Sequence, residues 1–134
     1  MSIKRIIMAM AVGAVVMGAQ AQNDIKLIVG TYTNGSSKGI YTFSFDQTTG
    51  KWAPIDTLAI ANPSYVTVTA DGKTIYAVSE NNDETASVTA IAFDSATGRM
   101  RLLNAQKTHG ADPCYVETND NFLLTANYTG GFMS

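Results

Sequence analysis

The sequence predicts an all-β protein of the β-propeller class, on the basis of three observations. An eight-residue phrase occurs twice, as FDQTTGKW at 45–52 and FDSATGRM at 93–100, with an offset of 48 positions. Apolar and polar residues alternate with a period of two after residue 22, as in β-strands. Four antiparallel strands that repeat every 40 to 50 residues or so are typical of a propeller blade, and a Greek-key sandwich would not repeat so regularly.

The first 21 residues predict a secretory signal peptide. Lys4 and Arg5 precede an apolar run of 12 residues, Ile6–Met17, and Ala19–Ala21 has the small-x-small pattern of a cleavage site. The run is shorter than the roughly 20 residues that span a bilayer, although an uncleaved anchor is the alternative. We therefore expect a soluble mature protein that starts at Gln22, is periplasmic or extracellular, and has no membrane contact after cleavage.

The rest of the chain, 22–134, is expected to form the N-terminal part of a propeller domain. The first blade has three predicted strands, at 25–33, 39–46 and 51–60. The second is a complete meander over 64–107, with strands at 64–70, 73–80, 86–94 and 99–107. A third blade starts over 113–129. A propeller needs about four to eight blades to close. A piece with about two and a half blades should therefore be inactive and aggregation-prone if it is made alone.

Turn residues separate these strands at the expected points. Gly50 and Gly98 close the two copies of the repeated phrase, and Asp71-Gly72 is a strong hairpin signal. Inside the second blade, Val66 and Val68 should pair with the strand that contains Ile75 and Ala77. The match NPSYVTV (62–68) with DPCYVET (112–118) has an offset of 50 and extends the repeat into the third blade.

Composition excludes several classes of function. The chain has 134 residues, of which 46% are hydrophobic and 15% charged, and its net charge is −2, so no nucleic-acid partner is expected. Cys114 is the single cysteine, which leaves no internal disulfide and favours a small buried side chain over a nucleophile. No nucleotide loop, zinc spacing or Ser-His-Asp pattern occurs, and neither a cofactor nor a metal is predicted.

Strand direction places the longer loops on one face of the propeller, where function is expected. This mouth should gather five segments of the chain: 31–34, 62–65, 80–82, 109–115 and 127–131.

Four phrases in these segments resemble the lactonase family of seven-bladed propellers, which includes 6-phosphogluconolactonases and carboxymuconate cyclases. They are IVGTYT (28–33), IYAVSE (75–80), GADPCYV (110–116) and LLTANYTGG (123–131), and the resemblance covers 26–133. One departure is Tyr115, which stands where many relatives have His after the Pro-Cys pair.

The resemblance implies a small-molecule lactone substrate, opened by water. Such a reaction needs a general base, oxyanion stabilisation and cations for an anionic substrate group. The family's His and Arg loops are expected beyond Ser134. One alternative is a non-catalytic exported propeller that binds glycans or a protein partner. Another is a quinone-dependent oxidoreductase, but its stacking aromatics and cation ligands do not stand out here.

Within this chain, Glu80 and His109 are the catalytic candidates. Glu80 is expected to orient substrate or assist a base with its side chain near Asn127, although it could instead hold two blades together. A loop histidine such as His109 is more often simply solvated. Tyr32, Asn127 and Tyr128 are candidates for substrate binding, with sheet capping as the alternative for the last two.

Overall fold

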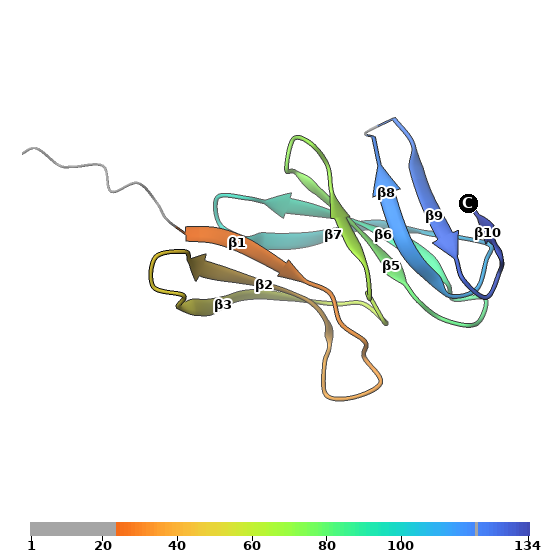
Figure 1. Ribbon diagram of the computed structural model, residues 1–134, viewed down its shortest axis with the longest axis horizontal. Coiled ribbons are helices and arrows are strands. Elements are labelled where there is room, and N and C mark those ends of the chain that lie inside the picture. Colours follow the sequence, from red (N-terminus) through yellow and green to blue (C-terminus); the bar gives the residue numbers. More distant parts are fainter. Residues whose placement is uncertain (1–23, 120) are drawn as a thin grey trace, which may run out of the picture.

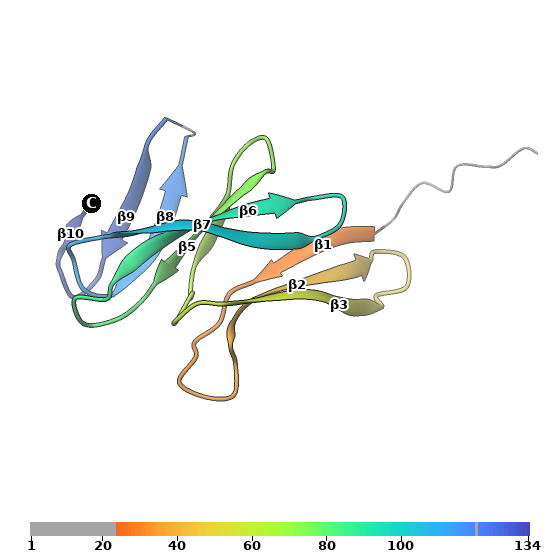
Figure 2. The ribbon, with the colours of Figure 1, turned by 180° about the vertical axis from the view of Figure 1, so that it is seen from behind.

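The computed structural model describes residues 24–119 and 121–134, and all their regular elements are β-strands. The predicted signal peptide therefore lies outside the described residues. Three antiparallel sheets follow one another along the chain, β1-β2-β3, then β4-β5-β6-β7, then β8-β9-β10, and they stand side by side in that order (Figures 1 and 2). The all-β blade architecture predicted from the repeat is confirmed.

The first sheet, blade 1, contains β1 (Asp24–Val29), β2 (Gly39–Asp46) and β3 (Trp52–Ala59). The first strand ends at Val29, before the predicted end at residue 33. The chain leaves the ladder because the next residues bond elsewhere: Thr31 Oγ1 donates to the Gly39 carbonyl (2.7 Å), and the Thr33 amide donates to Asn62 Oδ1 (2.8 Å).

The second sheet, blade 2, is a complete four-stranded meander. Its strands are β4 (Val66–Val68), β5 (Thr74–Ser79), β6 (Ser87–Asp94) and β7 (Arg99–Lys107). Val66 faces Ala77 and Val68 faces Ile75 in the β4–β5 register, which confirms the predicted pairing. The inner strand is shorter than the predicted 64–70 because residues 64 and 65 belong to the connection at the mouth.

The third sheet, blade 3, contains β8 (Pro113–Thr118), β9 (Leu123–Asn127) and the two-residue strand β10 (Phe132–Met133). The sequence did not predict β10. Gly131 makes the turn that leads into it, with φ of 70° and an amide that donates to the Asn127 carbonyl (2.8 Å).

Each face of blade 2 packs on a different neighbour because side chains alternate along a strand. The core between blades 1 and 2 includes Ile40 of β2 together with Ile75 and Ile91, all fully buried. The core between blades 2 and 3 joins Val78 and Val88 to Val116. Odd-numbered residues of β5 thus face blade 1, and even-numbered residues face blade 3. This packing sets the positions of the loops at the ends of the blades.

The repeated phrase forms the same turn in both copies. In the first, Asp46 accepts hydrogen bonds from the Thr48 and Thr49 amides and the Thr49 hydroxyl. In the second, Asp94 accepts from the amides of residues 96 and 97 and the Thr97 hydroxyl. In each turn, the threonine hydroxyl first and the amides next lower the pKa of the aspartate. These turns lie opposite the mouth and have a structural role.

Candidate functional site

Glu80, directly after β5, binds two hydroxyl groups at the mouth. Its Oε2 accepts hydrogen bonds from the Tyr32 hydroxyl (2.8 Å) and from the Ser64 hydroxyl. The Glu80 amide donates to the Asn62 carbonyl (3.0 Å), so the backbone that carries the carboxylate is also fixed. Among the described residues no group donates to Oε1, which leaves that oxygen able to accept from a ligand or a water molecule.

This carboxylate connects blades 1 and 2. The hydrogen bond to Glu80, followed by burial, raises the pKa of Tyr32 above its usual value, so the Tyr32 hydroxyl keeps its proton and remains a donor. Tyr32 of blade 1 therefore meets Ser64 and Glu80 of blade 2 at the mouth.

A second set of polar contacts joins the same blades further out. Asn62 Oδ1 accepts from the amide and hydroxyl of Thr33, and its Nδ2 donates to Asn81 Oδ1 (2.9 Å). At the next junction Asp112 accepts from the Asn82 amide and the Thr129 hydroxyl. Both acceptors precede a proline and have positive φ, 46° for Asn62 and 52° for Asp112. The sequence match with an offset of 50 residues thus corresponds to a repeated connection between blades.

The mouth does not include the Asn127 side chain, which corrects its predicted place near Glu80. Asn127 is buried, and its Nδ2 donates to the Phe132 carbonyl (3.1 Å) and the Ser134 hydroxyl (2.8 Å) of its own blade. The residue 48 positions before Asn127 is Ser79, which is also buried. Tyr128 is the true counterpart of Glu80: it is 81% exposed, and its amide donates to the Asp112 carbonyl as that of Glu80 does to Asn62.

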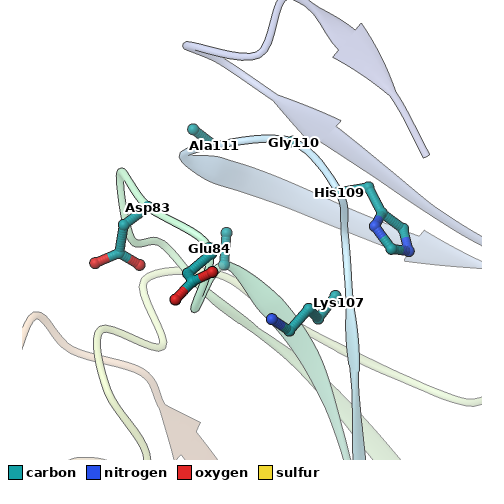
Figure 3. Close-up of a pocket in the computed structure, with 7 residues that line it drawn as sticks. Asp83, Glu84, Lys107, His109, Gly110 and Ala111 are labelled. Atoms are coloured by element: carbon teal, nitrogen blue, oxygen red, sulfur yellow. The ribbon is translucent and has the colours of Figure 1, made fainter.

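His109 lies apart from Glu80, at the outer rim of blade 2. It is exposed, has φ of 58°, and lines a hollow of about 400 Å³ formed with residues 83, 84, 86, 107, 110 and 111. In Figure 3 the Lys107 amine points toward Glu84, while the His109 ring lies on the other side of its loop. The structure therefore does not bring the two catalytic candidates together.

Two tyrosines that were not singled out as candidates belong to the inner wall below the mouth. Tyr65, directly before β4 of blade 2, contacts Tyr115 of β8 in blade 3, with ring centroids 4.8 Å apart. Both follow the Asx-Pro-x pattern of the offset-50 match, so the aligned repeats did contain a signal for them.

The described residues hold neither a metal cluster nor a membrane-spanning helix. No three side chains of His, Cys, Asp or Glu among them are arranged to bind a metal ion. Within the same ranges no helix has the length and apolar character needed to cross a membrane.

Comparison with known proteins connects this architecture to a family. The family model described as "Lactonase, 7-bladed beta-propeller" matches residues 26–134. A 6-phosphogluconolactonase of Bacillus subtilis is 39% identical over 108 residues, 77% of this chain and 30% of that protein. One from Formosa agariphila is 29% identical over 113 residues, 81% of this chain and 32% of its own length. The chain thus spans about a third of the length of these curated relatives.

Solved structures give the same result. A Bacteroides uniformis crystal structure with a provisional 6-phosphogluconolactonase assignment is 57% identical and superposes with a TM-score of 0.82, over 84% of this chain and 33% of that one. The periplasmic gluconolactonase of Pseudomonas aeruginosa is 32% identical with a TM-score of 0.72, over 77% of this chain and 31% of its own.

Proposed function

The chain belongs to the family of seven-bladed lactonase propellers, and from this membership we propose that its blades form part of an enzyme that opens a sugar-type lactone with water. Relatives named 6-phosphogluconolactonase and gluconolactonase support this reaction class. The observation in this chain that carries the proposal is the Glu80 carboxylate, held by Tyr32 and Ser64 through one oxygen only.

Opening a lactone ring with water has three chemical requirements. Water must add to the lactone carbonyl carbon, the resulting oxyanion must be stabilised, and the ring C–O bond must break as its oxygen takes up a proton. The open Oε1 of Glu80 suits the first requirement, because it can accept a proton or a hydrogen bond from the attacking water. It can equally accept from a substrate hydroxyl and orient the ring.

Tyr32 and Ser64 act in this proposal as positioning residues. Two hydroxyl donors on Oε2 fix the carboxylate plane, so Oε1 points in a constant direction. Tyr128 stands at the position equivalent to Glu80 in the next blade, which makes it a further candidate for contact with a ligand. His109 and Asn127 have no part in this arrangement, since the first lies at the outer rim and the second is bonded within its own blade.

Export is the second part of the proposal. The basic residues, the apolar run and the small-residue site of 1–21 are those of a cleaved secretory signal. The solved relative from Pseudomonas aeruginosa is named a periplasmic gluconolactonase, which gives the proposal a precedent within the family.

Proton release from D-glucono-δ-lactone and from its 6-phosphate, measured with the complete purified protein, tests the reaction. Hydrolysis above the spontaneous rate, saturable in either lactone, is the expected result. A protein that binds sugars but leaves both lactones at the spontaneous rate would instead be a non-catalytic, glycan-binding propeller.

A further inference from the structure

The Tyr65–Tyr115 pair forms a partly exposed aromatic surface, in which Tyr65 directly precedes β4 and Tyr115 belongs to β8. The two rings are tilted by 50° to each other, and each tyrosine is 40% exposed although its neighbours in the strand are more buried. Val116, beside Tyr115, is fully buried between blades. Strand alternation therefore turns Tyr115 away from that core.

Hydrogen bonds hold the backbone of Tyr65 and the ring of Tyr115 in place. The Tyr65 carbonyl accepts from the Val78 amide (3.1 Å), which ties its backbone to β5. The Tyr115 hydroxyl donates to Glu117 Oε2 (3.1 Å), two residues along β8, and this hydrogen bond raises the pKa of Tyr115. Glu117 Oε1 is in turn 3.4 Å from the Thr67 hydroxyl of β4. The surface is thus pre-formed and bridges two blades.

The polar groups around this surface suit hydroxyls and disfavour anions. Tyr65 directly follows Ser64, whose hydroxyl binds Glu80, so the residue next to the pair holds the Glu80 carboxylate. Glu117 adds a second carboxylate beside Tyr115. The strands β4 and β8 themselves carry no Lys or Arg. Two carboxylates without a cation on these strands would repel a phosphate or carboxylate group.

We propose that Tyr65 and Tyr115 form a stacking surface for the C–H face of an uncharged sugar ring, whose hydroxyls bind the Glu80 carboxylate. Ring C–H groups carry partial positive charge and pack against the negative face of an aromatic ring, and the contact also buries apolar area. The identification of that ring as the lactone of the substrate rests on the proposed function. Any phosphate on the substrate must then bind away from these two strands.

The pair is a specificity surface in this proposal. It recognises the ring itself, so its loss should weaken binding of phosphorylated and unphosphorylated sugars by the same factor. Its contact with the ring is present in both the bound substrate and the transition state, so its loss should raise KM and leave kcat nearly unchanged.

Binding is tested separately from hydrolysis with 1,5-anhydro-D-glucitol, a neutral ring that has no carbonyl to react. Saturation-transfer difference NMR on the complete protein should show transfer to the ring C–H protons of this probe. Tyr115→Leu and Tyr65→Leu keep apolar volume and should each reduce the transfer about 10-fold. Tyr115→Phe, which keeps the aromatic face, should retain it. Trp52→Leu, at an aromatic that is 65% exposed on the outer strand β3, is the matched control and should also retain it.

Kinetics with both lactones complete the test. Tyr115→Leu should raise the KM of both lactones by the same factor, about 10-fold, and should keep kcat within about twofold of the wild type. Transfer to the probe without hydrolysis by the wild type would support the surface and refute the lactonase proposal. Hydrolysis with no transfer, or with transfer unchanged in Tyr115→Leu, would refute the surface and leave the lactonase proposal intact. A KM increase confined to the phosphorylated lactone would also refute the stacking surface.

Discussion

The Tyr32 hydroxyl donates a 2.8 Å hydrogen bond to Glu80, the residue that occupies its own position one repeat later in the chain. Equivalent positions of successive blades are therefore brought into direct contact at the mouth. One repeat supplies the donor and the next supplies the acceptor, so the contact depends on different side chains at equivalent positions of the two blades.

Replacing Glu80 by glutamine should lower lactone turnover by about 10²-fold, because the charge that activates water or orients a hydroxyl is lost. The melting temperature should stay close to that of the wild type, since Gln keeps an acceptor for Tyr32 and Ser64 at a half-buried position. Steady-state kinetics and thermal unfolding on one preparation check both expectations.

Tyr32→Phe is the matched control for Glu80→Gln. It removes one hydroxyl from Oε2 and keeps the charge, so turnover should fall less than in Glu80→Gln. A purely structural Glu80 would give the reverse pattern, with a lower melting temperature and normal turnover of the folded enzyme.

Acid should weaken the two repeated turns. Hydrogen bonds hold the pKa of Asp46 and Asp94 below the ordinary value of 3.8. Their stabilisation is therefore complete above that value and is lost as the pH falls through the lower pKa of the folded state. Between about pH 5 and pH 2, the melting temperature of the double variant Asp46→Asn/Asp94→Asn should fall less than that of the wild type.

The threonine hydroxyl is the largest cause of each aspartate's shift, so Thr49→Val/Thr97→Val should reduce the acid dependence in the same direction. If the melting temperature falls equally at low pH in the wild type and in the Asp→Asn double variant, the two aspartates do not stabilise the turns in this way.

Gly30→Ala should destabilise the junction between blades 1 and 2. A Cβ at residue 30 would lie 2.0 Å from the Pro63 carbonyl oxygen, so the backbone of one blade would have to move. We expect a loss of about 1–3 kcal/mol in the free energy of unfolding, as for other overpacked sites. Denaturant unfolding of the complete protein measures it.

Gly35→Ala is the control for that experiment. Its Cβ would meet no heavy atom within 4 Å, so it should stay within about 0.5 kcal/mol of the wild type. Equal stability of the two alanine variants would show that the contact of Gly30 with Pro63 does not restrict this position.

The proposed signal sequence predicts the start of the exported protein. Made in a Gram-negative host with its own first 22 residues, the complete protein should be recovered outside the cytoplasm with Gln22 at its N-terminus. Mass spectrometry of the N-terminal peptide gives the answer, and a cytoplasmic protein with Met1 intact would refute the proposal.

The repeat allowed much of the fold to be predicted from the sequence. Alternation and the Asp71-Gly72 turn were enough for the Val66–Ala77 register, because both depend on local chemistry and a period of two. The early end of β1 at Val29 could not be predicted, since it depends on Thr33 bonding to Asn62, 29 residues away.

The candidate site was harder to predict for the same reason. The position of Glu80 at the mouth followed from strand direction, but its hydrogen bond to Tyr32 depends on how two blades pack. Asn127 was expected near Glu80 because the two positions are neighbours in the 48-residue register. Its exact counterpart in that register is Ser79, and both side chains are buried. Identical tyrosines at 65 and 115 were visible in the alignment, yet only the packing of β4 beside β8 shows that they touch.

The side chains of β5 alternate between two cores, and this arrangement also affects how the molecule unfolds. Ile75 and Ala77 belong to one junction, Val78 to the other, and no side chain of that strand is shared. Among the described strands, the contacts between sheets join neighbouring blades, with β3 against β7 and with β4 and β5 against β8. Loss of order at one junction therefore removes the partner of a single face of blade 2 and leaves the packing of its other face in place.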